Sequence, residues 1–97
     1  MKMSPIMRRT FKIYEAFKDE LIDAETPPEF EGARGRLVKK IRELYIRHRD
    51  SNDLKPEQAE KVREDMMAAW QMAIEDLAKA DPITHQTLRE TDLDFGG

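Results

Sequence analysis

The chain has 97 residues, no cysteine and a formal net charge of −3, with 39% hydrophobic and 38% charged residues. This length predicts one domain with a modest core, and the lack of cysteine excludes disulfides, thiolate nucleophiles and cysteine-ligated zinc. No apolar run reaches the roughly 18 residues of a membrane-spanning helix, and the N-terminus lacks the apolar core of a signal peptide, so neither is expected.

The first predicted helix covers residues 5–24. Ser4 and Pro5 form a helix-opening pair, because a serine hydroxyl can cap free amides and proline tolerates the first helical position. Side chains on one face recur at helical spacing: Ile6, Thr10, Ile13, Phe17 and Leu21. A proline pair at 27–28 ends this helix, and residues 29–32 complete a connection short enough to make the first two helices antiparallel neighbours.

The second predicted helix covers residues 33–50 and is strongly basic. It has seven basic residues and two acidic ones, a net charge of +5, so the rest of the chain carries −8. Its apolar residues follow one helical face: Leu37, Val38, Ile41, Leu44 and Tyr45. Burial of that face leaves the basic side chains pointing outward: Arg34, Arg36, Lys39, Lys40, Arg42, Arg47 and Arg49. This helix therefore offers a docking surface for something acidic.

The third predicted helix covers residues 56–80. It starts at a proline after a polar turn and stops before Pro82. Its apolar stripe consists of Ala59, Val62, Met66, Ala69, Trp70, Ala73 and Leu77. The three segments together predict an all-α fold, an antiparallel three-helix bundle over residues 1–81.

The remaining residues, 82–97, are expected to form a short acidic tail, extended or flexible. This segment is polar and lacks the apolar periodicity of the preceding helices. Three apolar residues in it are candidate anchors to the bundle: Leu88, Leu93 and Phe95.

The residue pattern gives no sign of a reaction centre. The two histidines, His48 and His85, fall in different elements, and neither takes part in a zinc-binding spacing. Adjacent carboxylates such as Glu64 and Asp65 diverge around a helix, which is typical of a solvated face. No phosphate-binding glycine loop is present. We therefore expect a non-enzymatic protein with no catalytic residue, no metal ligand and no directly bound cofactor.

The basic segment has three interpretations. The first is a plain solvated face, but a net charge of +5 over 18 residues is more than such a face needs. Nucleic-acid binding through phosphate contacts is an alternative, but the chain as a whole is acidic and its aromatic residues are not interleaved with the basic ones. An acidic protein partner fits best, because complementary charge steers and orients association.

The segment KKIRELYIRHRD, Lys39–Asp50, resembles the basic second helix of the LYR-motif family of small mitochondrial proteins. The following PEQAEKV, Pro56–Val62, is similar to the start of the family's third helix. Ile13-Tyr14-Glu15 stands where the family has leucine-tyrosine-arginine, so Tyr14 would be the motif tyrosine. Glu15 stands in place of the motif arginine, and Ile13 in place of the leucine.

The resemblance covers roughly residues 5–80 and implies a three-helix assembly factor or accessory subunit of a respiratory complex. It implies a place in the mitochondrial matrix or at the inner membrane. The implied partners are an acyl carrier protein and a respiratory-complex subunit, with Tyr14 among the partner-binding residues. The carrier's acyl-phosphopantetheine would enter the helical core, although the chain itself binds no cofactor.

The resemblance also implies roles for individual side chains. Arg36, Lys40 and Arg47 share one flank of the second helix and would contact an acidic helix of the carrier. Arg42 and Arg49 share the other flank and would contact the phosphopantetheine phosphate or a second partner. The residues expected to line an acyl channel, or else the core, are Phe17, Ile41, Leu44, Tyr45, Met66 and Trp70, and Tyr14 would also line such a channel.

A second class of function stays open. Compact, cysteine-free and charge-rich helical proteins of this length are common among small bacterial or phage regulators, inhibitors and antitoxins. Such a protein would be cytoplasmic and would bind a protein or a nucleic acid through the same basic helix.

Overall fold

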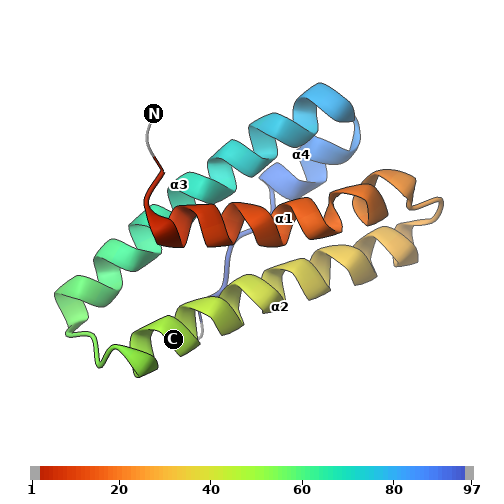
Figure 1. The fold of residues 1–97 in the computed structure, drawn as a ribbon. Helices are drawn as coiled ribbons and strands as arrows, with labels where there is room; N and C mark the ends of the chain where they lie inside the picture. Colours follow the sequence, from red (N-terminus) through yellow and green to blue (C-terminus); the bar gives the residue numbers. More distant parts are fainter. Residues whose placement is uncertain (1–2, 96–97) are drawn as a thin grey trace.

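The computed structural model describes residues 3–95, which form four helices and no strand. The helices are α1 (Pro5–Asp23), α2 (Pro27–Ser51), α3 (Pro56–Ala80) and α4 (Thr84–Arg89). Successive long helices run antiparallel, so the predicted all-α three-helix architecture is confirmed, with a short fourth helix added (Figure 1). Among these residues, no helix is long and apolar enough to cross a membrane.

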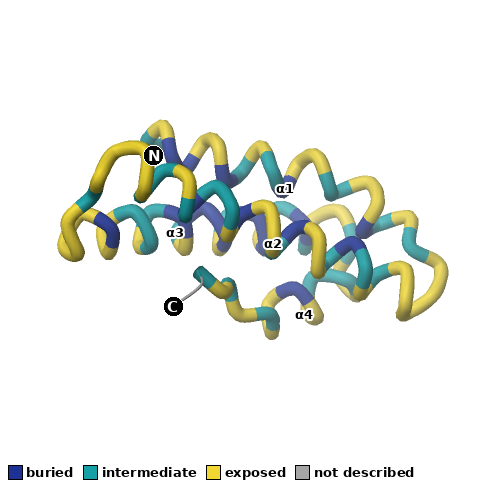
Figure 2. Tube along the Cα trace, turned by 90° about the horizontal axis from the view of Figure 1, so that it is seen from below, coloured by how far each residue is buried: buried dark blue, intermediate teal, exposed yellow. Residues whose placement is uncertain are grey.

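The helices are arranged in three layers. α2 and α3 diverge from the turn that joins them and contact each other little, whereas α1 packs against both (Figure 1). α4 packs against α3, and with the C-terminal segment it lies on the side opposite α1 (Figure 2). α2 therefore has α1 on one side and the C-terminal segment on the other.

α1 begins where the sequence predicts. The Ser4 hydroxyl accepts a hydrogen bond from the Met7 backbone N–H at 3.3 Å, and Pro5 occupies the first turn. The helix ends at Asp23, and Ala24 has extended backbone geometry. Thr10 is its one buried polar residue, and its hydroxyl donates to the Ile6 carbonyl at 2.8 Å.

α2 starts six residues earlier than predicted, so the predicted connection over residues 29–32 is wrong. Proline is as compatible with the first turn of a helix as it is with the end of the preceding one, because the first N–H groups have no intrahelical partner. Pro27 therefore opens α2 directly, and the Thr26 hydroxyl accepts from the Glu29 backbone N–H at 3.4 Å. Phe30, expected in a loop, packs against the core from the first turn of α2.

The prediction of an extended tail after Asp81 is wrong for α4. The Asp81 carboxylate accepts hydrogen bonds from the backbone N–H groups of Ile83 and Thr84 at 3.1 and 3.2 Å, and from the Thr84 hydroxyl at 2.6 Å. The Thr84 hydrogen bonds hold the pKa of the Asp81 carboxyl below its usual value. Leu88 is fully buried, and Leu93 and Phe95 pack against the core. Residues 96–97 of the predicted tail lie outside the described residues.

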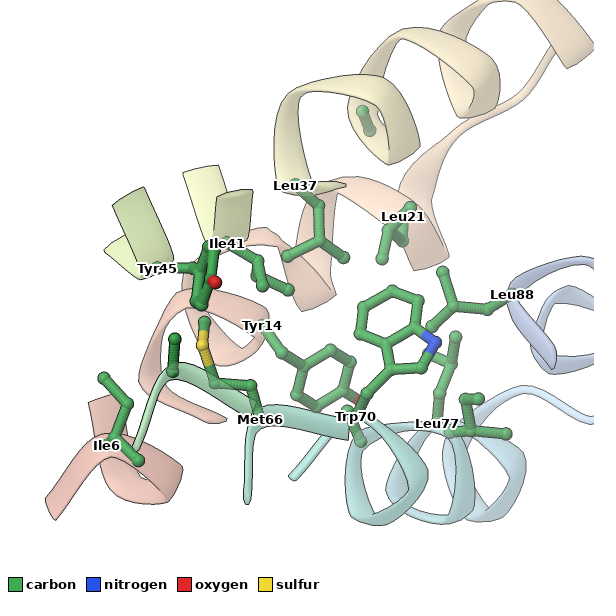
Figure 3. Packing of buried hydrophobic residues seen from close by; sticks show 14 residues of the cluster. Ile6, Tyr14, Leu21, Leu37, Ile41, Tyr45, Met66, Trp70, Leu77 and Leu88 are labelled. Carbon is green, nitrogen blue, oxygen red and sulfur yellow. The ribbon is translucent and has the colours of Figure 1, made fainter. Parts of the chain in front are cut away.

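The core joins all four helices. Its central residues are shown in Figure 3 and include Tyr14 and Leu21 from α1, Leu37, Ile41 and Tyr45 from α2, Met66, Trp70 and Leu77 from α3, and Leu88 from α4. The indole of Trp70 is 1% exposed and lies near Leu21 and Leu88 (Figure 3). α4 therefore covers one end of the core that the three long helices leave open.

Candidate functional site

The basic side chains of α2 fall into two groups with different surroundings. Leu37, Ile41 and Tyr45 are buried and define the inward face of the helix. The group that we call the open surface is exposed and consists of Arg36, Lys39, Lys40 and Arg47. The second group, the tail flank, faces the C-terminal segment or the aromatic ring of Tyr45, and consists of Arg34, Arg42 and Arg49.

The open surface has few internal partners. Arg36 forms an ion pair with Glu20 of α1, and Lys40 lies 4.0 Å from Glu43. These side chains are roughly half exposed, and exposed ion pairs of this kind contribute about 0–1 kcal/mol. Within residues 3–95, no carboxylate lies within ion-pair distance of Lys39 or Arg47. The charge of this surface is therefore largely available to another molecule.

The tail flank, in contrast, is engaged within the molecule. Arg34 donates to the Thr91 hydroxyl at 3.0 Å and also pairs with Glu31. Arg42 lies 3.5 Å from the Asp94 carboxylate. The sequence predicted that all seven basic residues would face a partner, but these contacts occupy part of the tail flank.

The third member of the tail flank belongs to a cluster around Tyr45. The guanidinium of Arg49 pairs with Asp50 at 3.0 Å and lies 5.5 Å from the centre of the Tyr45 ring. Arg63 of α3 donates to the Tyr45 hydroxyl at 2.6 Å, with its guanidinium 5.7 Å from the same ring. The Phe95 ring meets the Tyr45 ring edge-on, with 5.2 Å between the two ring centres. Tyr45 is therefore buried, but cationic and aromatic groups surround it.

Tyr14, expected among the partner-binding residues, is completely buried and offers no surface to a partner in this conformation. Its hydroxyl donates to the Asp76 carboxylate at 2.8 Å, and Lys18 pairs with the same carboxylate at 2.9 Å. Burial, followed by the bond to Asp76, raises the pKa of the Tyr14 phenol. The hydrogen bonds from Lys18 and Tyr14 hold the pKa of Asp76 below its usual value. Tyr14 therefore links α1 to α3.

The residues expected to line a channel or core do come together. Ile41, Tyr45, Met66 and Trp70 are buried in one cluster, and Phe17 and Leu44 are partly buried against it. Figure 3 shows the side chains of Ile41, Tyr45, Met66 and Trp70 between the helices. Burial of these residues accounts for their spacing in the sequence without any ligand.

Two features near the candidate site are not apparent from residue spacing. A surface cleft of about 330 Å³ lies between the α1–α2 turn and α4, lined by Phe30, Ile83 and Thr87 among others, and Ile83 is 85% exposed. The other feature is the contact of residues 91–95 with α2. The alternation of acidic and apolar residues in TDLDF was the one sequence signal for it.

Within residues 3–95, no group of three or more histidine or acidic side chains converges as a metal site would require. Comparison of the chain with protein-family models, curated proteins and solved structures found no match. The resemblance to LYR-motif proteins therefore stays a prediction from the motif residues, and the geometry of α2 carries the functional argument.

Proposed function

We propose that this chain is a non-enzymatic interaction protein that binds an acidic protein partner through the open surface of α2. The observation that carries the proposal is the exposure of four basic side chains on one helix, two of which lack an ion-pair partner within residues 3–95. A surface with unpaired charge attracts a partner without first losing internal contacts.

The physical basis is local. At physiological salt the Debye length is about 8 Å, so the acidic residues elsewhere on the chain do not cancel the field of the open surface. Rigid presentation on a helix that is buried along its other face fixes the spacing of the charges. Such a charge pattern steers association and sets the orientation of the partner.

The more specific proposal is an LYR-like assembly factor or accessory subunit that docks an acyl carrier protein. It is supported by the residues of Lys39–Asp50, which supply three of the four residues of the open surface, and by an α1–α2–α3 arrangement like the one the resemblance implies. On this proposal an acidic helix of the carrier lies along the open surface. Tyr14 serves the fold rather than the contact, because it is buried.

The test is charge reversal with a matched control. The variant K39E/K40E/R47E reverses three exposed residues of α2, and R8E/R9E/K12E makes the same change in net charge at three exposed residues of α1. Binding to acyl carrier protein, with and without an acyl group, and to a DNA duplex is measured by calorimetry at two salt concentrations. We expect the α2 variant to lose roughly 100-fold in affinity for the carrier, about 2.7 kcal/mol, and the α1 variant to lose far less.

Two outcomes would contradict the proposal. If the two variants lose affinity equally, net charge and not the α2 surface controls binding. If the wild type binds only the duplex, with affinity that falls steeply as salt rises, the chain is a nucleic-acid-binding regulator.

A further inference from the structure

Residues 90–95, which we call the strap, cross from α4 to α2 on the side opposite α1 (Figures 1 and 2). Three of their side chains contact α2. Thr91 accepts a hydrogen bond from Arg34, Asp94 pairs with Arg42, and Phe95 packs edge-on against Tyr45. These contacts join residues that are 50 or more positions apart in the sequence.

The order of these contacts follows the order of residues on both segments. Arg34 and Arg42 are eight residues apart on a helix that rises about 1.5 Å per residue, so their backbones are about 12 Å apart. Thr91 and Asp94 are three residues apart, about 10 Å in an extended chain. The polar groups of the strap are therefore spaced to meet both arginines. Phe95, directly after Asp94, then meets the ring of Tyr45 on α2.

The two sides of the strap differ in chemistry. Leu93 and Phe95 are partly buried and pack against the core, whereas Asp92 and Asp94 between and beside them are exposed. This alternation is that of an extended segment with one apolar and one acidic edge. The α2 side is complementary, because it offers two guanidinium groups and an aromatic ring.

The ring of Tyr45, the aromatic part of this site, is held in place by arginines of α2 and α3. Arg63 donates to the Tyr45 hydroxyl at 2.6 Å, and the guanidinium groups of Arg49 and Arg63 both lie within 6 Å of the ring centre. Tyr45 is 2% exposed with the strap in place, and its hydrogen bond to Arg63 holds the ring from α3 without using any residue of the strap. A fixed ring among cations suits an incoming group that is both aromatic and next to a carboxylate.

One polar contact of the strap, the ion pair between Arg42 and Asp94, is open to solvent. The side chains of Arg42 and Asp94 are 46% and 66% exposed, and exposed ion pairs are weak. Within residues 3–95, only side-chain contacts join the strap to α2, so its release breaks no backbone hydrogen bond to that helix. Exchange of this segment for another is therefore structurally simple.

We propose that Arg34, Arg42 and Tyr45 form a docking site for a short acidic segment of a partner protein in which an aromatic residue directly follows a carboxylate. The strap occupies this site as an intramolecular competitor. The inference rests on the proposed function for the nature of the partner, but it concerns the tail flank and not the open surface.

The experiment uses the full chain and a fluorescein-labelled peptide with the sequence of residues 90–95, ETDLDF. The variant D94K/F95A keeps the strap but removes its charged and aromatic contacts. A flexibly tethered segment competes at an effective concentration of about 1 mM. If the peptide binds the vacant site with a dissociation constant of about 0.1 mM, it should bind this variant roughly tenfold more tightly than the wild type, in which the strap competes. Fluorescence anisotropy measures the binding, and circular dichroism verifies that both proteins are folded.

Controls separate this site from the open surface. For these controls the strap carries D94A/F95A, so that it cannot pair with a reversed charge at position 42. Adding R42E to this background should abolish peptide binding, and a peptide with lysine in place of Asp94 should restore part of it. Adding R47E makes the same change in charge on the open surface and should leave peptide binding unchanged. An R47E effect equal to that of R42E would overturn the inference.

Other outcomes would also overturn it. Equal peptide affinity for the wild type and D94K/F95A would show that the strap does not occupy the site, and no binding to either would show that no docking site exists. Dimers of the wild type that dissociate on D94K/F95A substitution, detected by light scattering, would show that the strap serves a second copy. Loss of carrier binding by K39E/K40E/R47E tests the proposed function independently of these results.

Discussion

Replacing Tyr14 with phenylalanine isolates one hydrogen bond between α1 and α3. The Tyr14 side chain is completely buried, and its hydroxyl donates to the Asp76 carboxylate at 2.8 Å. The phenylalanine ring keeps the packing of the tyrosine ring, so the change removes the hydroxyl alone. A hydrogen bond to a charged group is worth about 1.5–3 kcal/mol. Because Asp76 keeps Lys18 at 2.9 Å and stays partly exposed, we expect a loss of about 1–2 kcal/mol in the free energy of unfolding at neutral pH.

The pH dependence of this loss gives a sharper test. Burial and the bond to Asp76 raise the pKa of Tyr14 above its value in the unfolded chain, so its contribution is fully present below about pH 10. Above that pH the unfolded phenol ionises, and the advantage of the wild type over Y14F should shrink by about 1.4 kcal/mol per pH unit.

In acid the group that matters is Asp76, and its pKa shift has the opposite sign. Lys18 and then Tyr14 lower the pKa of Asp76 in the folded state, so the stabilisation that depends on its charge is present above about pH 4 and is lost as the pH falls further. Y14F removes one of these two hydrogen bonds, so the variant should lose less stability in acid than the wild type. The stability difference should therefore form a plateau between about pH 4 and pH 10.

Urea unfolding followed by circular dichroism, repeated over this pH range, measures the difference. A value that stays constant through pH 11 would refute the reasoning, because it would mean that Tyr14 is not a buried, hydrogen-bonded phenol. Y14F should also keep wild-type affinity for acyl carrier protein. A loss of that affinity with stability unchanged would instead place Tyr14 at the partner contact.

Two further substitutions test the core. Trp70→Ala should lower the free energy of unfolding by roughly 3–5 kcal/mol, since the indole is 1% exposed, and a variant that unfolds at the same urea concentration as the wild type would contradict its burial. Leu88→Ala should cost roughly 2–5 kcal/mol, whereas Ile83→Ala, at a position 85% exposed just before α4, should change stability by less than about 0.5 kcal/mol. Equal, small effects of these two variants in urea unfolding would mean that α4 does not pack on the core.

The three long helices could be predicted because their apolar residues repeat at helical spacing over many turns. The start of α2 was missed because the pair Pro27-Pro28 carries two signals, a stop for one helix and a start for the next. In the structure the Thr26 hydroxyl accepts from the Glu29 backbone N–H, which marks the pair as the start of α2. α4 was missed because six residues are too few to show a period. It forms where the Asp81 carboxylate accepts from the Thr84 backbone N–H and Leu88 reaches the core.

The residues of the candidate site also divide into those that the sequence predicts and those that it does not. The exposure of Arg36, Lys39, Lys40 and Arg47 follows from helical spacing alone, because a helix that buries Ile41 must turn these residues outward. The engagement of Arg34 and Arg42 could not be derived from spacing. It depends on where α4 directs the strap, and that depends on packing between residues far apart in the sequence.

The two surfaces of α2 together imply a criterion for the partner. The strap is tethered, so it competes at about millimolar effective concentration, and a free acidic peptide at cellular concentration would lose to it. A partner already docked on the open surface holds its own acidic segment near the same helix, at a comparable effective concentration, and can compete on equal terms. If both proposals hold, the strap favours a partner that engages the open surface and the tail flank together. A protein that offers only negative charge would meet half of this criterion, and the strap would stay in place.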